Sequence, residues 1–225
     1  MDTVLFASEL NARISRHDLL CHSFYKAWTA GELTRDDLRQ YACDYYHHVA
    51  AFPTYLSALH SRLTDGETRR AVLRNLRDEE IDGVAHSDMW LDFAEGYGAS
   101  RDEITEPIAE IRELIENFRR IAREGSTVEA LAAFYAYEWQ VPRVAKEKAR
   151  GLSEMYGADA KTRGYFTVHT YADVEHSQVW LDLLNRELER DPSQREAALN
   201  AADEAAQWLW HALDGIEARR TAVAA

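Results

Sequence analysis

Two histidines and an aspartate in the segment 168–176 have the spacing of ligands that lie on one side of a helix. In a helix that turns about 100° per residue, His169, Asp173 and His176 fall within about 60° of one another. Two imidazoles and one carboxylate on a single stripe can chelate a metal ion. No lysine or arginine lies in this segment, so the carboxylate has no local ion-pair partner. The spacing therefore predicts a metal site.

Three more potential ligands lie upstream of this segment. Glu79 and His86 are seven residues apart, or two helical turns, so they share one face if a single helix carries both. Glu80, about 100° away from that face, is expected to point to solvent or to a salt bridge. Glu138 is surrounded by aromatic residues, where a charge usually needs a partner or a metal.

Together these residues provide three carboxylates and three imidazoles, the ligand inventory of a dinuclear iron or manganese site in a helical bundle. The six predicted ligands are Glu79, His86, Glu138, His169, Asp173 and His176. The alternative is a chance pairing, because the chain contains 39 aspartates and glutamates and some acid precedes almost any histidine by seven residues. The triplet in 169–176 is the rarer pattern, and it favours a metal.

The ligands must be positioned by helices. Nearly every segment has the period of an amphipathic helix and begins at a capping residue, so the predicted fold class is all-α. With only four prolines and ten glycines to interrupt it, the chain is expected to form one domain, residues 1–225, of seven to eight helices. Helices are predicted from Thr34 to about Leu59, from Asp65 to near Gly96, from Ser100 with Pro107 near the start, from the capping box 125–129 through Glu138 and a kink at Pro142, through the His169 stripe to about Arg190, and from Ser193 to about Trp208.

The composition excludes several classes of protein. The formal net charge of −13 argues against a nucleic-acid partner, because phosphate binding uses clustered lysines and arginines. No stretch reaches the roughly 20 apolar residues that cross a bilayer, so no membrane partner is expected. The two cysteines form no Cys-x-x-Cys pair, and no apolar N-terminal run resembles a signal peptide. A cytoplasmic protein is therefore expected.

Three motifs are spread over most of the chain: Asp78-Glu79-Glu80 followed by His86 and Trp90, then Tyr137-Glu138-Trp139-Gln140-Val141-Pro142, then the His169 stripe. Together they resemble the haem-oxygenase-like dimetal oxidases, and among them the family of the chlamydia protein associating with death domains. The resemblance implies a seven-helix haem-oxygenase-like bundle in which the six predicted ligands hold two metals, iron alone or iron with manganese.

The resemblance also implies an unusual reaction. It implies that the enzyme makes p-aminobenzoate, the folate precursor, from a tyrosine of the protein itself, with reduced metals, molecular oxygen and an external reductant. The matching positions here are Tyr25, as the source of the ring, Lys148, as the source of the nitrogen, and two further tyrosines, Tyr137 and Tyr165. A chain that consumes its own residues in this way acts once.

The residues themselves leave other interpretations open. Lys148 can be a surface lysine that extends from a helix end, and the tyrosines can be half-buried core residues whose hydroxyls find polar partners. The protein could be a conventional dimetal oxidase that acts on a free small molecule, or a metal-free interaction module of the same fold. A thiaminase-like enzyme is less consistent, because such enzymes use a cysteine and no metal.

The resemblance further suggests a homodimer. Trp208 and Trp210, near the end of the last predicted helix, are candidates for an exposed contact surface. Three histidines of the helix that starts at Thr34 are expected to be ordinary core or surface residues and receive no role: His47, His48 and His60.

Overall fold

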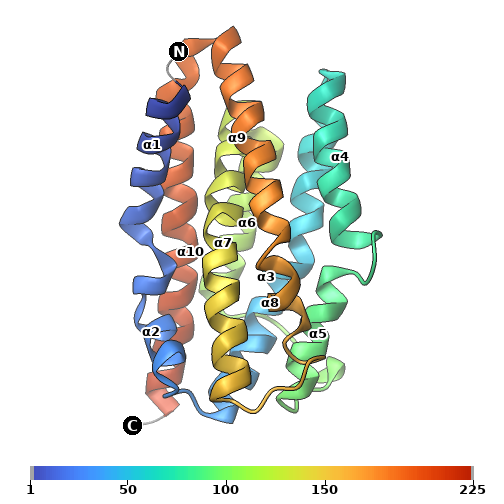
Figure 1. Ribbon diagram of the computed structural model, residues 1–225, viewed down its shortest axis with the longest axis vertical. Helices are drawn as coiled ribbons and strands as arrows, with labels where there is room; N and C mark the ends of the chain where they lie inside the picture. The colour runs from blue at the N-terminus through green and yellow to red at the C-terminus, as the bar shows by residue number, and fades with distance from the viewer. Residues whose placement is uncertain (1–2, 224–225) are drawn as a thin grey trace.

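The computed structural model describes residues 3–223, and within them every regular element is a helix. Figure 1 shows the long helices lying side by side along one axis, with α4 and α5 on the opposite side of the bundle from α1. The all-α prediction is confirmed. The ten α-helices of the described residues are α1 (Thr3–Ile14), α2 (Ser23–Ala30), α3 (Arg35–Arg62), α4 (Gly66–Glu80), α5 (His86–Gly96), α6 (Ala109–Glu124), α7 (Thr127–Glu154), α8 (Gly164–His169), α9 (Ala172–Arg190) and α10 (Arg195–Val223).

Three of the long helices begin at the predicted capping residues. The Thr34 side chain accepts a hydrogen bond from the Asp37 N–H, and the Asp37 carboxylate accepts one from the Thr34 N–H. Ser126 and Glu129 form the same reciprocal box at the start of α7, and Asp65 caps α4. These side chains satisfy N–H groups that have no partner inside the helix, which is why the sequence alone could locate the starts.

The single helix predicted over residues 65–96 is wrong. Two helices, α4 and α5, cover this stretch, and residues 81–85 form a loop between them. Gly83 in the loop has φ of +112°, a backbone conformation that favours glycine and interrupts a helix. Glu79 therefore lies at the end of α4 while His86 begins α5, so the two residues do not share a helical face.

A second break divides the predicted metal stripe. His169 is the last residue of α8, whereas Asp173 and His176 lie in the first turns of α9. Between them the Tyr171 N–H bonds to the Val168 carbonyl, three residues back, at 3.0 Å, so the chain tightens and changes direction. These two breaks account for the difference between the seven to eight helices predicted and the ten in residues 3–223.

Two other boundaries differ from the prediction. The chain forms only a short 3₁₀ turn at Arg101–Glu103, and α6 begins later, at Ala109. Pro107 explains the delay, because proline disfavours helical backbone at the residue that precedes it. The last helix extends to Val223 instead of ending near Trp208.

The two tryptophans predicted to form an exposed contact surface are half-buried within their own chain. Trp208 packs against the ring of Phe118, with centroids 5.6 Å apart, and Trp210 packs against His22 at 4.7 Å. The predicted exposure of the two tryptophans is therefore wrong, and the homodimer itself stays a prediction. Among the described helices, none combines the length and the apolar composition needed to span a bilayer.

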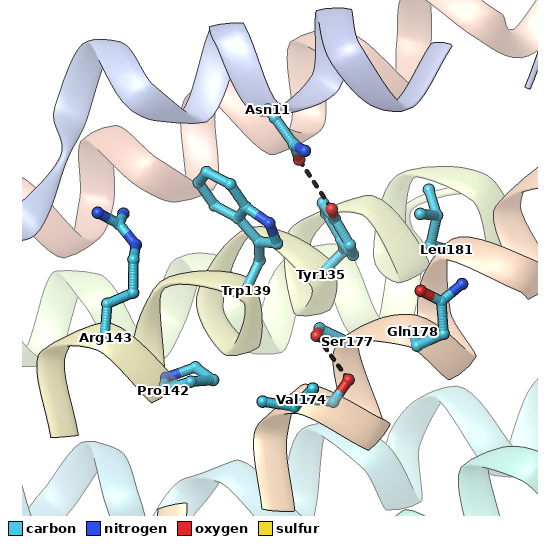
Figure 2. Close-up of a pocket in the computed structure, with 9 residues that line it drawn as sticks. All are labelled: Asn11, Tyr135, Trp139, Pro142, Arg143, Val174, Ser177, Gln178 and Leu181. Atoms are coloured by element: carbon cyan, nitrogen blue, oxygen red, sulfur yellow. Dashed lines mark hydrogen bonds between the residues drawn. The ribbon is translucent and has the colours of Figure 1, made fainter. Parts of the chain in front are cut away.

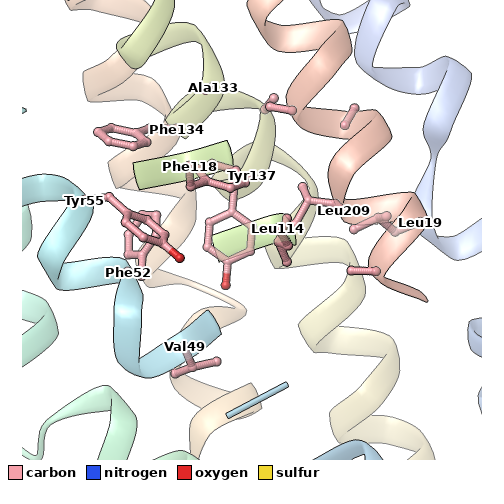
Figure 3. Packing of buried hydrophobic residues seen from close by; sticks show 14 of the residues in the cluster. Leu19, Val49, Phe52, Tyr55, Leu114, Phe118, Ala133, Phe134, Tyr137 and Leu209 are labelled. Carbon is pink, nitrogen blue, oxygen red and sulfur yellow. The ribbon is translucent and has the colours of Figure 1, made fainter. Parts of the chain in front are cut away.

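The centre of the bundle is α7, which packs against α9 and α10. All residues from 130 to 138 of this helix are buried, so it is enclosed on every side. Figure 3 shows the Tyr137 ring among Phe52, Phe118 and Leu114, which come from α3 and α6. A polar side chain on such a helix needs a partner inside the protein, and this requirement applies to Glu138, the next residue.

Candidate metal centre

The predicted metal ligands converge on one interior site from five helices. Donor atoms of Glu79, His86 and His169 all lie within 4.8 Å of one another, and so do those of Glu79, Glu138 and His176. All of these residues are buried. Glu79 belongs to both groups, so its carboxylate is the ligand that two metal ions would share if each group held one. Glu80 is exposed, as the sequence predicts.

Asp173 completes the cluster. Its Oδ1 lies 3.4 Å from Nδ1 of His176, and its side chain lines a small cavity of about 10 Å³ together with Glu79, Glu138 and His169. The structure thus brings all six predicted ligands together, even though the helices that carry them differ from those predicted.

Hydrogen bonds around the cluster orient two of the imidazoles. Nδ1 of His169 lies 2.8 Å from the carbonyl oxygen of Tyr165, which can only accept, so Nδ1 carries the proton and Nε2 is the free donor atom. Nε2 of His176 lies 3.0 Å from the Asp78 carboxylate, which leaves Nδ1 facing Glu138 and Asp173. Second partners of this kind fix the orientation of metal-binding histidines.

A buried donor atom without a partner indicates that the site fits a metal. Nδ1 of His176 is buried and has no hydrogen-bond partner among the described residues, although Asp173 lies 3.4 Å away and Glu138 3.8 Å away. Glu138 itself is held by Asn75, which donates to it at 3.2 Å, and by the indole N–H of Trp180. Oxygen and nitrogen donors in this mixture suit iron or manganese.

Protons occupy this site when metal does not. Burial raises the pKa of Glu138 above its ordinary range, because removal from water disfavours the carboxylate. Burial acts to lower the pKa of His176, but the nearby carboxylates of Asp173 and Glu138 outweigh it and raise that pKa. This coupled pair of groups therefore shares protons near neutral pH in the metal-free protein.

Metal binding is expected to release these protons. A metal needs the carboxylate of Glu138 and a neutral imidazole of His176, so iron affinity should increase as pH rises from about 6 to about 8. Calorimetric titrations in buffers with different ionisation enthalpies would count the protons released per metal. Glu138→Gln, which has no carboxyl proton to lose, should release fewer. An affinity that does not change with pH, with no proton release, would contradict the assignment.

The predicted tyrosine and lysine line a second cavity beside the metal cluster. This cavity of about 30 Å³ is almost entirely apolar, and its walls include Tyr25, Lys148, Tyr137 and Tyr165. Tyr137 and Tyr165 also line the cavity of the metal cluster. The two phenols therefore form the wall between the predicted reacting residues and the metals, and the Tyr165 ring stacks on the His169 imidazole with centroids 3.9 Å apart.

Lys148 is a buried residue, which rules out the alternative of a surface lysine. It is 5% exposed, and its Nζ lies over six aromatic rings, at 4.5 Å from Tyr25 and 4.7 Å from Tyr41. Ring faces attract an ammonium ion, but no carboxylate is near, and burial lowers the pKa of Lys148 well below its ordinary value. The side chain is therefore a neutral amine, able to act as a nucleophile.

Tyr41 is a contact of the two predicted reacting residues that the sequence did not reveal. Its hydroxyl accepts a hydrogen bond from Nζ of Lys148 and lies 3.1 Å from the hydroxyl of Tyr25. It thus connects the two predicted reacting residues. Its partners are 16 and 107 residues away in the chain, and no local pattern signals such a contact.

His48 remains without a role, as predicted. Its ring packs against Tyr137 with centroids 5.0 Å apart, and burial lowers its pKa to about 3, so the imidazole is neutral.

A larger groove of about 410 Å³ lies between α1, α7 and α9 and is shown in Figure 2. Its walls include Trp139, Arg143 and Gln178 but none of the predicted site residues.

Comparisons with known proteins agree with this arrangement. A family described as iron-containing redox enzymes matches residues 39–210, more than half of the chain. A 4-aminobenzoate synthase of Chlamydia muridarum is 42% identical over 212 residues, covering 93% of this chain and 89% of the relative. A 4-aminobenzoate synthase of Nitrosomonas europaea is 38% identical over 228 residues, with 96% and 92% covered.

Solved structures share the fold at low sequence identity. A protein of Shewanella denitrificans described as having a heme oxygenase-like fold has a TM-score of 0.80 at 16% identity, with 97% of this chain and 93% of that chain covered. A TenA homologue from Pseudomonas syringae pv. tomato has a TM-score of 0.79 at 18% identity, with 94% and 92% covered. These matches confirm the predicted fold, and the sequence matches confirm the predicted relationship. The chain belongs to the family of iron-containing redox enzymes and has a haem-oxygenase-like fold.

Proposed function

We propose that this enzyme makes 4-aminobenzoate from the side chain of its own Tyr25, with nitrogen from its own Lys148. The main supporting observation is that Tyr25 and Lys148 line one cavity, and that Tyr137 and Tyr165 line both this cavity and the cavity of the metal cluster. The names of the relatives support the product. The positions of the Tyr25 and Lys148 side chains support these two residues as the source of the product's atoms.

The atoms of tyrosine suit this product. The ring and Cβ of a tyrosine supply the carbon skeleton of 4-aminobenzoate, with the phenol oxygen at the position that must carry nitrogen. Release breaks the Cα–Cβ bond of Tyr25 and oxidises Cβ to the carboxylate, with dioxygen as the oxidant. The neutral amine of Lys148, 4.5 Å from the Tyr25 ring centroid, supplies the nitrogen: a C–N bond forms at the carbon that bears the phenol oxygen, and that oxygen leaves as water. Dioxygen then oxidises the Cε–Nζ bond, and hydrolysis leaves the nitrogen on the ring and an aldehyde at Cε of Lys148.

The metal ligands and the intervening tyrosines have distinct roles in this proposal. Glu79, His86, Glu138, His169, Asp173 and His176 hold two metals, Fe/Fe or Fe/Mn, which when bound supply the activation of dioxygen. Tyr137 and Tyr165 carry electrons from Tyr25 toward the metal cluster in intermediate steps, because phenols can be oxidised and because both side chains line both cavities. An external reductant supplies the electrons that first reduce the metals.

The cavity argues against a free small-molecule substrate. A cavity of about 30 Å³ has room for only about two water molecules, which leaves no room for a free aromatic compound beside Lys148. Tyr25 is itself the aromatic group at that position. Membership of a family of iron-containing enzymes likewise disfavours a metal-free interaction module.

Isotope labelling tests the proposal directly. Protein expressed with ring-¹³C tyrosine and ¹⁵N-lysine, loaded with iron, reduced and exposed to air, is expected to release 4-aminobenzoate that carries both labels. Mass spectrometry of the product and of the peptide around Tyr25 would measure this. Unlabelled product, or an obligatory requirement for an added aromatic compound, would favour the conventional oxidase.

A further inference from the structure

The start of the helix that carries Tyr25 is held by a buried imidazole. His22 immediately precedes α2 and is 2% exposed, and Tyr25 is the third residue of that helix. Tyr25 and Trp28, both on α2, provide two of the six rings around Nζ of Lys148. The placement of α2 therefore sets the geometry between the two proposed reacting residues.

Both ring nitrogens of His22 have partners. The backbone N–H of Phe24 donates a hydrogen bond to Nδ1 at 3.1 Å, so the imidazole caps the start of α2. A backbone N–H can only donate, so Nδ1 is unprotonated and Nε2 carries the proton. Nε2 lies 3.0 Å from Oδ1 of Asp214 in α10, and this carboxylate accepts a hydrogen bond from it. Asp214 thus favours the one neutral tautomer that can cap the helix.

The α2 helix is too short to hold its shape without such contacts. It has eight residues, and isolated helices of this length are unstable in water. Its other end closes at Gly31, whose φ of +74° favours glycine. The usual capping residues are serine, threonine, aspartate and asparagine. His22 is longer, and its second nitrogen binds another helix while its ring packs against Trp210 with centroids 4.7 Å apart.

The turn before His22 is attached to a different helix. The backbone N–H of Leu19 donates to Oε1 of the buried Gln140 in α7 at 3.0 Å. The same helix carries Lys148 further along. Residues 19–22 therefore connect the start of α2 to α7 through Gln140 and to α10 through Asp214. Figure 1 shows α2 beside the C-terminal part of α10, and residues of these two helices are in contact.

We infer that His22 is a positioning residue for the reaction of Tyr25, and that Asp214 acts with it by fixing the tautomer that caps α2. The inference rests on the proposed function, in which Tyr25 must meet Lys148. The hydrogen bonds of His22 go to Phe24 and Asp214, so it acts through the backbone of α2. Small displacements of reacting groups slow reactions strongly. The predicted metal ligands lie on α4, α5, α7, α8 and α9, so loss of the cap leaves them in place.

The rate of 4-aminobenzoate release after exposure to air measures this role. His22→Leu, which lacks both nitrogens, should release product about tenfold more slowly than the wild type, with unchanged metal content. His22→Asn should recover most of the lost rate, because the asparagine oxygen can cap a helix. His17→Asn is the control, since His17 also packs against Trp210, at 6.0 Å, but lies outside the α2 cap. A wild-type rate in His22→Leu, or no recovery in His22→Asn, would overturn the inference.

The exposed partner of His22 allows a second test in which the core stays intact. Nitrogen-15 NMR of histidine-labelled protein, loaded with diamagnetic zinc, should show a protonated Nε2 at His22 in the wild type and in Asp214→Asn. Asp214→Leu should show both tautomers, faster exchange of the Phe24 amide proton and release about threefold slower. A protonated Nδ1 in the wild type, or one unchanged tautomer in Asp214→Leu, would contradict the assignment. These signals need no product, whereas the proposed function fails if the wild type releases no 4-aminobenzoate.

Discussion

Replacing Tyr25 by phenylalanine is expected to lower the yield of 4-aminobenzoate by at least about 100-fold while both metals remain bound. The phenol oxygen marks the carbon that receives nitrogen, and a phenylalanine ring is far harder to oxidise. The hydroxyl of Tyr25 bonds only to Tyr41, at 3.1 Å, so its loss costs about 1 kcal/mol of stability and leaves the bundle folded. Liquid chromatography with mass spectrometry would measure product, and elemental analysis would measure metal.

A matched variant separates the chemistry from the general loss of a buried phenol. Tyr135, a residue of α7, is buried as Tyr25 is, but its hydroxyl donates a hydrogen bond to Asn11 at 2.7 Å and faces the groove of Figure 2. Tyr135→Phe should therefore retain the wild-type yield. Lys148→Arg should fail like Tyr25→Phe, because a guanidinium stays charged and cannot supply a simple amine. Undiminished product from Tyr25→Phe would disprove the self-consuming reaction.

Glu79→Gln is expected to remove both metals, not one. Glu79 is the only residue that belongs to both groups of converging donors, and an amide lacks the charge that a bridging ligand contributes. Metal content should fall from about two ions per chain to well below one, and product should fall at least about 100-fold with it. Elemental analysis of the purified variant, with circular dichroism to verify folding, would measure the effect.

The adjacent residue provides the control for this second prediction. Glu80 has the same side chain but is exposed, so Glu80→Gln should keep the wild-type metal content. A Glu79→Gln protein that retains one tightly bound ion would show that the two groups of ligands act independently. Glu79 would then belong to one metal only.

The sequence predicted the composition of the site better than the path of the chain through it. Helix starts at Thr34 and Ser126 depend on side chains three residues away, and such local interactions are visible in a sequence. The loop at Gly83 and the turn at Tyr171 depend on how α5 and α8 pack against the bundle, which no local pattern encodes. Glu79 and His86 therefore meet as predicted, with 2.9 Å between Oε2 and Nδ1, but across a loop instead of along one helix.

The surroundings of the reacting residues could not be predicted from the sequence for a related reason. The resemblance indicated Tyr25 and Lys148, but the aromatic enclosure comes from residues on four separate helices, and only the folded chain assembles it. The burial of Lys148 is a property of that enclosure. Its neutral amine could not be inferred from a lysine in a charged segment of α7.

The tight packing of Tyr25 has a consequence for the lifetime of the protein. Its ring is 3% exposed and lies against Phe24 and Tyr41, with centroids 5.7 and 6.4 Å away. If the reaction removes this ring, the used chain acquires a hole in its core, and a loss of this kind typically costs about 3–5 kcal/mol. Because natural domains have only about 5–15 kcal/mol of net stability, a spent molecule would unfold more often and reach cellular proteases sooner than an unused one. The same ring would then serve as raw material for the product and as the structural mark that distinguishes fresh enzyme from exhausted enzyme.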